Sequence, residues 1–194
     1  MNHTRKGVPT HTLDNLLDAI PNNEPIAAGL KLWLVDRSGR LISPGTFTAA
    51  PDAPLMTANC PHGNTPPSRE CPCGIHYLPN VERFFLVADH MAKLNPHLPT
   101  AVTIGIGIGR TLTDFLPNEK WAGATTLRSD RFLALRCLYA DNVPERLAVL
   151  LRARSTVPTT RGATETHARR ALDEIRAALS RRGDSGARMD KDTP

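Results

Sequence analysis

The sequence predicts an α+β fold, in which a small, mostly antiparallel sheet is flanked by short helices. Three observations predict it. Residues 100–110 alternate apolar side chains with glycines, as a β-strand does. Residues 30–43 hold two short apolar runs on either side of a turn, which is typical of a hairpin. Residues 81–94 repeat apolar side chains at helical spacing between Pro79 and Asn95-Pro96.

The first expected element is a short helix over residues 12–20. Its apolar residues, three or four positions apart, are Leu13, Leu16, Leu17 and Ile20. Thr12 could cap the helix, and Pro21 ends it because proline has no backbone N–H to continue the ladder. Residues 1–25 are therefore assigned to an N-terminal helix and linker.

A domain over residues 26–155 follows and holds the sheet. Strands are expected at 30–35 and 40–43, then at 100–110, 121–127 and 131–139, with a short helix over 145–154. Gly105, Gly107 and Gly109 share one face of their strand, so another backbone or a ring could approach it closely. A dinucleotide fingerprint is excluded, because the third glycine comes too early and no helix follows.

Residues 156–194 are expected to form a basic helical and disordered tail. Of the net charge of +5, most belongs to residues 152–194, which hold 10 basic and 6 acidic side chains. A weak nucleic-acid or partner contact would use Arg169, Arg170, Arg176, Arg181 and Arg182. Interleaved acidic residues and the absence of aromatic residues from this segment equally fit a solvated helix.

Four potential metal ligands lie within the fourteen residues 60–73: Cys60, His62, Cys71 and Cys73. The segment is rich in proline and poor in apolar residues, so it cannot fold by burying carbon alone. Zinc prefers four thiolate or imidazole ligands in a tetrahedron. The pattern therefore predicts a structural Zn²⁺ that staples this loop to one end of the sheet. The motifs H-E-x-x-H and H-x-E with P-C-x-x-C are absent, so no catalytic residue is assigned.

Other interpretations of the cluster remain open at this point. His76 could replace His62 as a ligand, and Cys137 could join the three clustered cysteines in an iron–sulfur cluster. A zinc hydrolase would need one coordination position left to water. A thiol redox sensor would need a disulfide, with Cys60 as one partner because a bond between Cys71 and Cys73 would close a strained ring.

The sequence also resembles a family of uncharacterised actinobacterial proteins over residues 28–140. The resemblance rests on Leu32-Trp33 with Gly39-Arg40-Leu41, on Cys60 before a Pro-rich stretch with histidine, and on Cys71-Pro72-Cys73-Gly74-Ile75-His76-Tyr77, which fits a C-x-C-G-[IL]-[YH] element. His62 directly follows Cys60-Pro61 and departs from the H-x-x-P spacing of that family. The resemblance implies a fold and a metal site, and no activity.

The composition points to a cytoplasmic protein. No apolar run is long enough to span a bilayer, and no apolar stretch follows the basic start of the chain. Clustered cysteines in a reducing compartment favour metal binding over disulfides. We therefore expect a non-catalytic, regulatory zinc-binding module without a membrane partner, which presents a surface to a protein or nucleic-acid partner.

Overall fold

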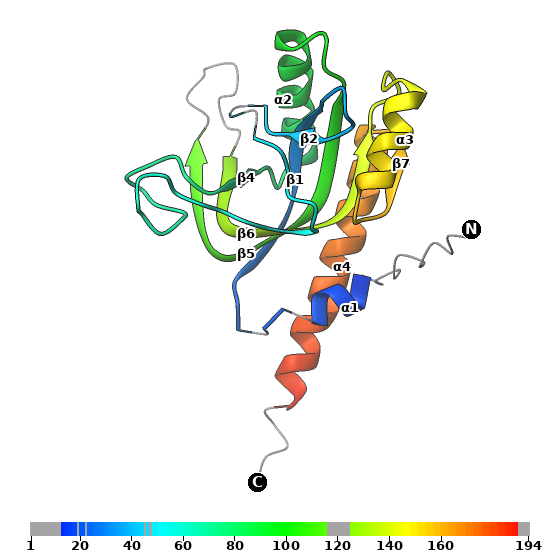
Figure 1. Ribbon diagram of the computed structural model, residues 1–194. Helices are drawn as coiled ribbons and strands as arrows, with labels where there is room; N and C mark the ends of the chain where they lie inside the picture. Colours follow the sequence, from blue (N-terminus) through cyan, green and yellow to red (C-terminus); the bar gives the residue numbers. More distant parts are fainter. Residues whose placement is uncertain are drawn as a thin grey trace, which may run out of the picture.

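The computed structural model describes residues 13–18, 20, 21, 23–44, 46, 48–115 and 125–189 (Figure 1). The helices are α1 (Leu13–Asp18), α2 (Val81–Leu94), α3 (Glu145–Arg154) and α4 (Glu165–Met189). The strands are β1 (Ile26–Val35), β2 (Leu41–Ile42), β3 (Leu55–Thr57), β4 (Ile75–Tyr77), β5 (Thr100–Phe115), β6 (Thr125–Tyr139) and β7 (Thr159–Arg161). This confirms the predicted α+β class.

The seven strands form one mostly antiparallel sheet in the order β2-β1-β5-β6-β3. The long strand β6 pairs with β4, β3 and β7 one after another along its outer edge, and only the pairing with β7 is parallel. The separate strands expected at 121–127 and 131–139 were wrong for the described part, since Thr125–Tyr139 is one continuous strand. Residues 121–124 lie outside the described residues.

Glycines on β5 allow the close approaches that the sequence predicted. A Cβ atom on Gly107 would overlap the phenol ring of Tyr77, and one on Gly105 would overlap the backbone carbonyl of Leu133. Both a ring and a backbone therefore lie against the bare face of this strand. The expected hairpin is also confirmed, because Leu34 pairs with Ile42 and Gly39 turns the chain with a φ of 76°.

Two cores lie on opposite faces of the sheet. The larger core packs α1, α2 and α4 against β1, β5 and β6. The smaller core lies on the other face, where α3 packs against the sheet and where side chains of β3 and β4 gather with Trp33, Tyr77 and Phe132. Figure 1 shows α2 and α4 behind the sheet, and α4 continuing past its edge.

The predicted helix over residues 81–94 has the expected bounds, because both of its ends are capped. The side chain of Asn80 accepts a hydrogen bond from the backbone N–H of Arg83, which satisfies one free donor of the first turn. Asn95 ends the helix, and its backbone N–H donates to the carbonyls of Met91 and Ala92.

The segment 156–194, expected as a tail, contributes to the main core. Ala168, Leu172 and Ile175 are each 0% exposed and lie at helical spacing along the face of α4 that meets the sheet. The helix continues to Met189, so the disorder expected from residue 183 was wrong up to that point. Within the described residues, no helix has both the length and the apolar character needed to cross a membrane.

Candidate metal centre

The loop between β3 and β4 carries the predicted ligands and gathers three of them. One potential ligand atom from each of Cys60, His62 and Cys71 lies within 4.8 Å of the other two. The backbone N–H of Gly63 donates to the carbonyl of Cys60, and Gly63 has a φ of 78°. This tight turn folds His62 back toward the Cys60 sulfur. The group could therefore hold a metal ion.

The distances between donor atoms are close to those of a zinc tetrahedron. Sulfurs bound to zinc at about 2.3 Å lie about 3.8 Å apart. The Cys60 sulfur is 3.5 Å from that of Cys71 and 3.9 Å from Nδ1 of His62. Cys73 adds a fourth donor, whose sulfur lies 2.7 Å from that of Cys71. This contact is too long for a disulfide, and the two sulfurs would separate by about 1 Å around a shared zinc ion.

The sulfurs of Cys71 and Cys73 are hydrogen-bonded across this short contact. The hydrogen bond from the Cys73 thiol lowers the pKa of Cys71 to about 6, and the backbone N–H of Cys73 lowers it further. The same hydrogen bond raises the pKa of Cys73 to about 11. A thiolate at Cys71 is the form that binds a metal, and a divalent cation would displace the proton that Cys73 retains.

The other candidate ligands lie outside this group. The ring nitrogen Nε2 of His76 is 2.9 Å from the carbonyl of Pro72 and so is already hydrogen-bonded to the loop backbone. Cys137 is fully buried on β6 and pairs with Thr103 of β5. Burial raises the pKa of its thiol to about 12. The structure thus places His62, not His76, with the sulfurs, and it does not bring Cys137 into the cluster.

Arg128 of β6 holds the loop against the sheet. Its Nη1 donates to the backbone carbonyls of Cys71 and Cys73, at 2.7 and 2.8 Å. Its Nε and Nη2 donate to the carboxylate of Asp114 on β5. The guanidinium therefore joins both loop cysteines to the β5–β6 hairpin. Such contacts behind the ligands orient a metal site.

Gly74 lets the chain leave the loop directly above Arg128. Its φ is 123°, and a Cβ atom there would lie 3.2 Å from the Cβ atoms of Arg128 and Pro67. Arg128 and Asp114 were not predicted from the sequence, in which they lie 57 and 43 positions from Cys71. The signal that could have found Arg128 is a charged side chain at a buried position of a strand, flanked by the buried Thr126 and Ser129.

The arginines predicted for weak partner contact mostly bind within the chain. Arg169 pairs with Glu82 of α2 and with Glu165, and Arg170 pairs with Glu174. Arg176 donates to the carbonyl of Pro79, and Arg182 donates to that of Ile20. Arg181 also has an interaction partner. These contacts attach α4 to α2 and to the end of α1, and a nucleic-acid contact stays a prediction.

Comparison with family models, curated proteins and solved structures finds no significant match for the chain. The resemblance to uncharacterised actinobacterial proteins therefore stays a prediction. Function has to be argued from the geometry of the site.

Proposed function

We propose that the protein is a non-catalytic zinc-binding module, in which a structural Zn²⁺ fixes the loop 60–73 on the sheet. The observation that carries the proposal is the grouping of Cys60, His62 and Cys71, with Cys73 beside Cys71. Three thiolates and one imidazole are a set of ligands that structural zinc takes. The second observation is Arg128, which supports the backbone of both cysteines of the 71–73 pair.

A structural role follows from the number of donors. Four protein ligands fill a tetrahedron, whereas a hydrolytic zinc keeps one position for water. Binding to such a set contributes on the order of 10 kcal/mol, which is comparable to the whole folding stability of a small domain. The free energy of zinc binding would therefore hold a loop that has little apolar surface to bury.

The ordered loop is the surface that we propose the module presents to a protein or nucleic-acid partner in the cytoplasm. Its exposed residues include both charge signs, at Arg69 and Glu70. All four cysteines are free. The basic residues of α4 could add a phosphate contact, which binding to duplex DNA at low and high salt would test. Affinity that is absent at low salt would reject that contact.

Metal removal tests the structural role. We expect a strong chelator to raise amide exchange across residues 55–80 and to lower the melting temperature of the whole chain. Cys73→Ser should do the same without chelator, because it removes one ligand. Cys137→Ala is the matched control, since this cysteine lies outside the cluster, and it should leave exchange in the loop unchanged. Unchanged melting after verified loss of metal would refute the structural role.

A thiol redox sensor is the second candidate, favoured by the 3.5 Å between the sulfurs of Cys60 and Cys71. Hydrogen peroxide would take two electrons from these thiolates and two protons from the solvent, an S–S bond would form, and two molecules of water and the zinc ion would be released. Zinc release by peroxide that dithiothreitol reverses would support the sensor. Retention of zinc at peroxide levels that oxidise free thiols would refute it.

A further inference from the structure

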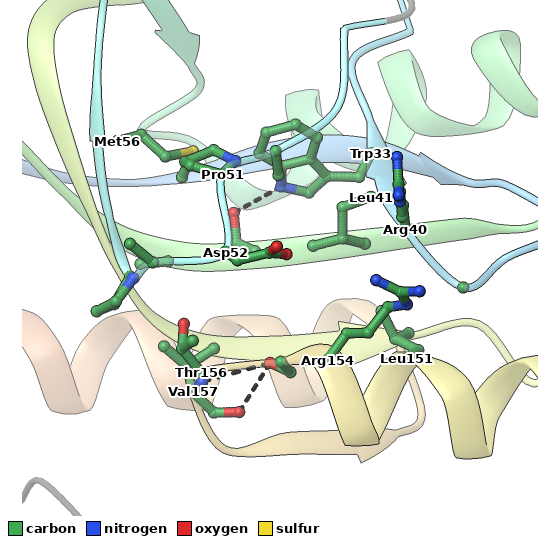
Figure 2. Close-up of a pocket in the computed structure, with 17 residues that line it drawn as sticks. Trp33, Arg40, Leu41, Pro51, Asp52, Met56, Leu151, Arg154, Thr156 and Val157 are labelled. Carbon is green, nitrogen blue, oxygen red and sulfur yellow. Dashed lines mark hydrogen bonds between the residues drawn. The ribbon is translucent and has the colours of Figure 1, made fainter.

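A pocket lies on the face of the sheet opposite α2 and α4, away from the metal loop. It opens between the turn after β1, the segment that leads into β3, and the C-terminal end of α3 (Figure 2). The open space within it measures about 560 Å³, the part open to solvent included.

The floor of the pocket is apolar and buried. Its buried side chains are Trp33, Met56, Thr103, Ala134 and Leu151. The indole Nε1 of Trp33 donates to the hydroxyl of Thr103 at 2.8 Å, so the one polar group of the ring already has its partner. The indole is therefore held in one orientation and offers an apolar surface to a ligand. Leu41 and Val157 extend this surface toward the mouth.

Three charged side chains stand at the mouth: Arg40, Arg154 and Asp52. All three are exposed, and none forms an ion pair within the part of the chain that the structure describes. Figure 2 draws both arginine side chains toward the same end of the pocket, with Asp52 on the segment before β3. The nearby Arg152 and Arg161 differ from Arg40 and Arg154, because each of them donates a hydrogen bond to the carboxylate of Glu145.

Asp36, the acidic residue nearest to Arg40 in the sequence, already accepts hydrogen bonds from its own turn. The carboxylate of Asp36 accepts hydrogen bonds from the backbone N–H groups of Ser38 and Arg40 and from the hydroxyl of Ser38. It serves the turn between β1 and β2 and leaves the Arg40 guanidinium without an ion pair there. The pocket thus combines an apolar floor with two unpaired positive groups and one unpaired negative group.

We propose that this pocket binds a free amino acid with an apolar side chain. The α-carboxylate would contact Arg40 and Arg154, the α-ammonium would contact Asp52, and the side chain would cover Trp33 and Met56. An apolar anion would leave the Asp52 carboxylate unpaired beside a like charge. An apolar cation would leave both arginines unpaired. A zwitterion matches both signs at the mouth and the apolar floor.

Titration of the purified, folded chain tests the proposal. Calorimetry would compare leucine with isocaproate, which lacks the ammonium group, and with isoamylamine, which lacks the carboxylate. Phenylalanine and methionine would show how large a side chain the floor accepts. We expect leucine, or one of these two, to bind at least about tenfold more tightly than its analogue that lacks either charge, because each charged hydrogen bond contributes that much.

Two variants assign the charges. Asp52→Asn should abolish the preference for leucine over isocaproate, and Arg154→Gln should weaken both at least about tenfold. The matched controls are Asp141→Asn and Arg146→Gln, which are exposed and lie outside the pocket, and both should bind as the unmodified chain does. The proposal is overturned if no apolar amino acid binds at millimolar concentration. It is also overturned if isocaproate binds as tightly as leucine, or if Asp52→Asn keeps the preference.

Discussion

Replacing Arg128 by methionine would test whether the metal loop depends on the β5–β6 hairpin. Methionine keeps an unbranched side chain at a position whose side chain is 5% exposed, but it removes four hydrogen bonds. The carbonyls of Cys71 and Cys73 lose their donor, and Asp114 loses its cation. Breaking a buried ion pair in this way costs about 3–5 kcal/mol. Because the Asp114 side chain is 34% exposed, water offsets part of this loss, and we expect about 2–4 kcal/mol.

The loss should appear in two measurements. Urea unfolding of the zinc-loaded chain gives the free energy of unfolding, which should fall by the amount above. Competition with a chromogenic chelator gives the affinity for zinc, which should fall about 10–100-fold because Arg128 orients the backbone of two ligands. Both the stability and the zinc affinity of Arg128→Lys should lie between those of the unmodified chain and those of Arg128→Met, since lysine keeps the charge but cannot make the paired contact with Asp114.

Arg136→Met is the matched control on the same strand. Arg136 pairs with Glu174, and its side chain is 44% exposed, so its removal should cost about 0–1 kcal/mol and leave zinc affinity unchanged. The reasoning fails if Arg128→Met binds zinc as tightly as the unmodified chain does, or if it unfolds no earlier than Arg136→Met.

Three further predictions concern stability and reactivity. Gly107→Ala should lower the free energy of unfolding by about 1–3 kcal/mol, because its Cβ would overlap the Tyr77 ring, and a variant that unfolds at the same denaturant concentration as the unmodified chain would contradict this. Burial lowers the pKa of Lys31 to about 8, so the unfolded chain binds this proton more tightly and stability should rise from pH 8 to the ordinary pKa of 10.5. Below pH 8, Lys31→Met should therefore raise the free energy of unfolding by up to about 3 kcal/mol, reduced by the loss of the ammonium contact with the Trp33 ring. This gain should shrink as the pH rises toward 10.5, and a gain that stays constant would contradict the prediction. Iodoacetamide at neutral pH should leave the buried Cys137 unmodified in the folded chain. After a chelator has removed the metal, the same reagent should alkylate Cys60 and Cys71. Mass mapping that finds Cys137 alkylated first would disprove its burial.

The local elements could be predicted from the sequence because their signals are local. The caps and apolar spacing of residues 81–94 lie within the helix itself, and the ends match those of α2. Three of the four predicted ligands, Cys60, His62 and Cys71, lie together in the structure. They could be singled out from the sequence because they are close along the chain and their chemistry is distinctive. Bare glycine positions on β5 correctly predicted that a ring and a backbone lie against it.

What could not be predicted depends on pairing between distant segments. β6 carries polar residues at Arg128, Ser129 and Asp130, which lie between the two strands that were expected at 121–127 and 131–139. Within the strand, Arg128 is neutralised by Asp114, 14 positions away on β5, and Arg131 by Glu24, 107 positions away. β7 lies within the segment that was expected as a tail, and its three residues pair in parallel with the end of β6.

The metal content of the native protein tests the central claim most directly. Native mass spectrometry, before and after a mild oxidant is added, would be combined with X-ray absorption at the zinc edge. We predict one zinc ion per folded chain, bound by three sulfurs near 2.3 Å and one nitrogen near 2.0 Å. A fully folded chain that carries no metal, or a zinc ion with an oxygen in place of one of these ligands, would contradict a structural zinc site built from Cys60, His62, Cys71 and Cys73.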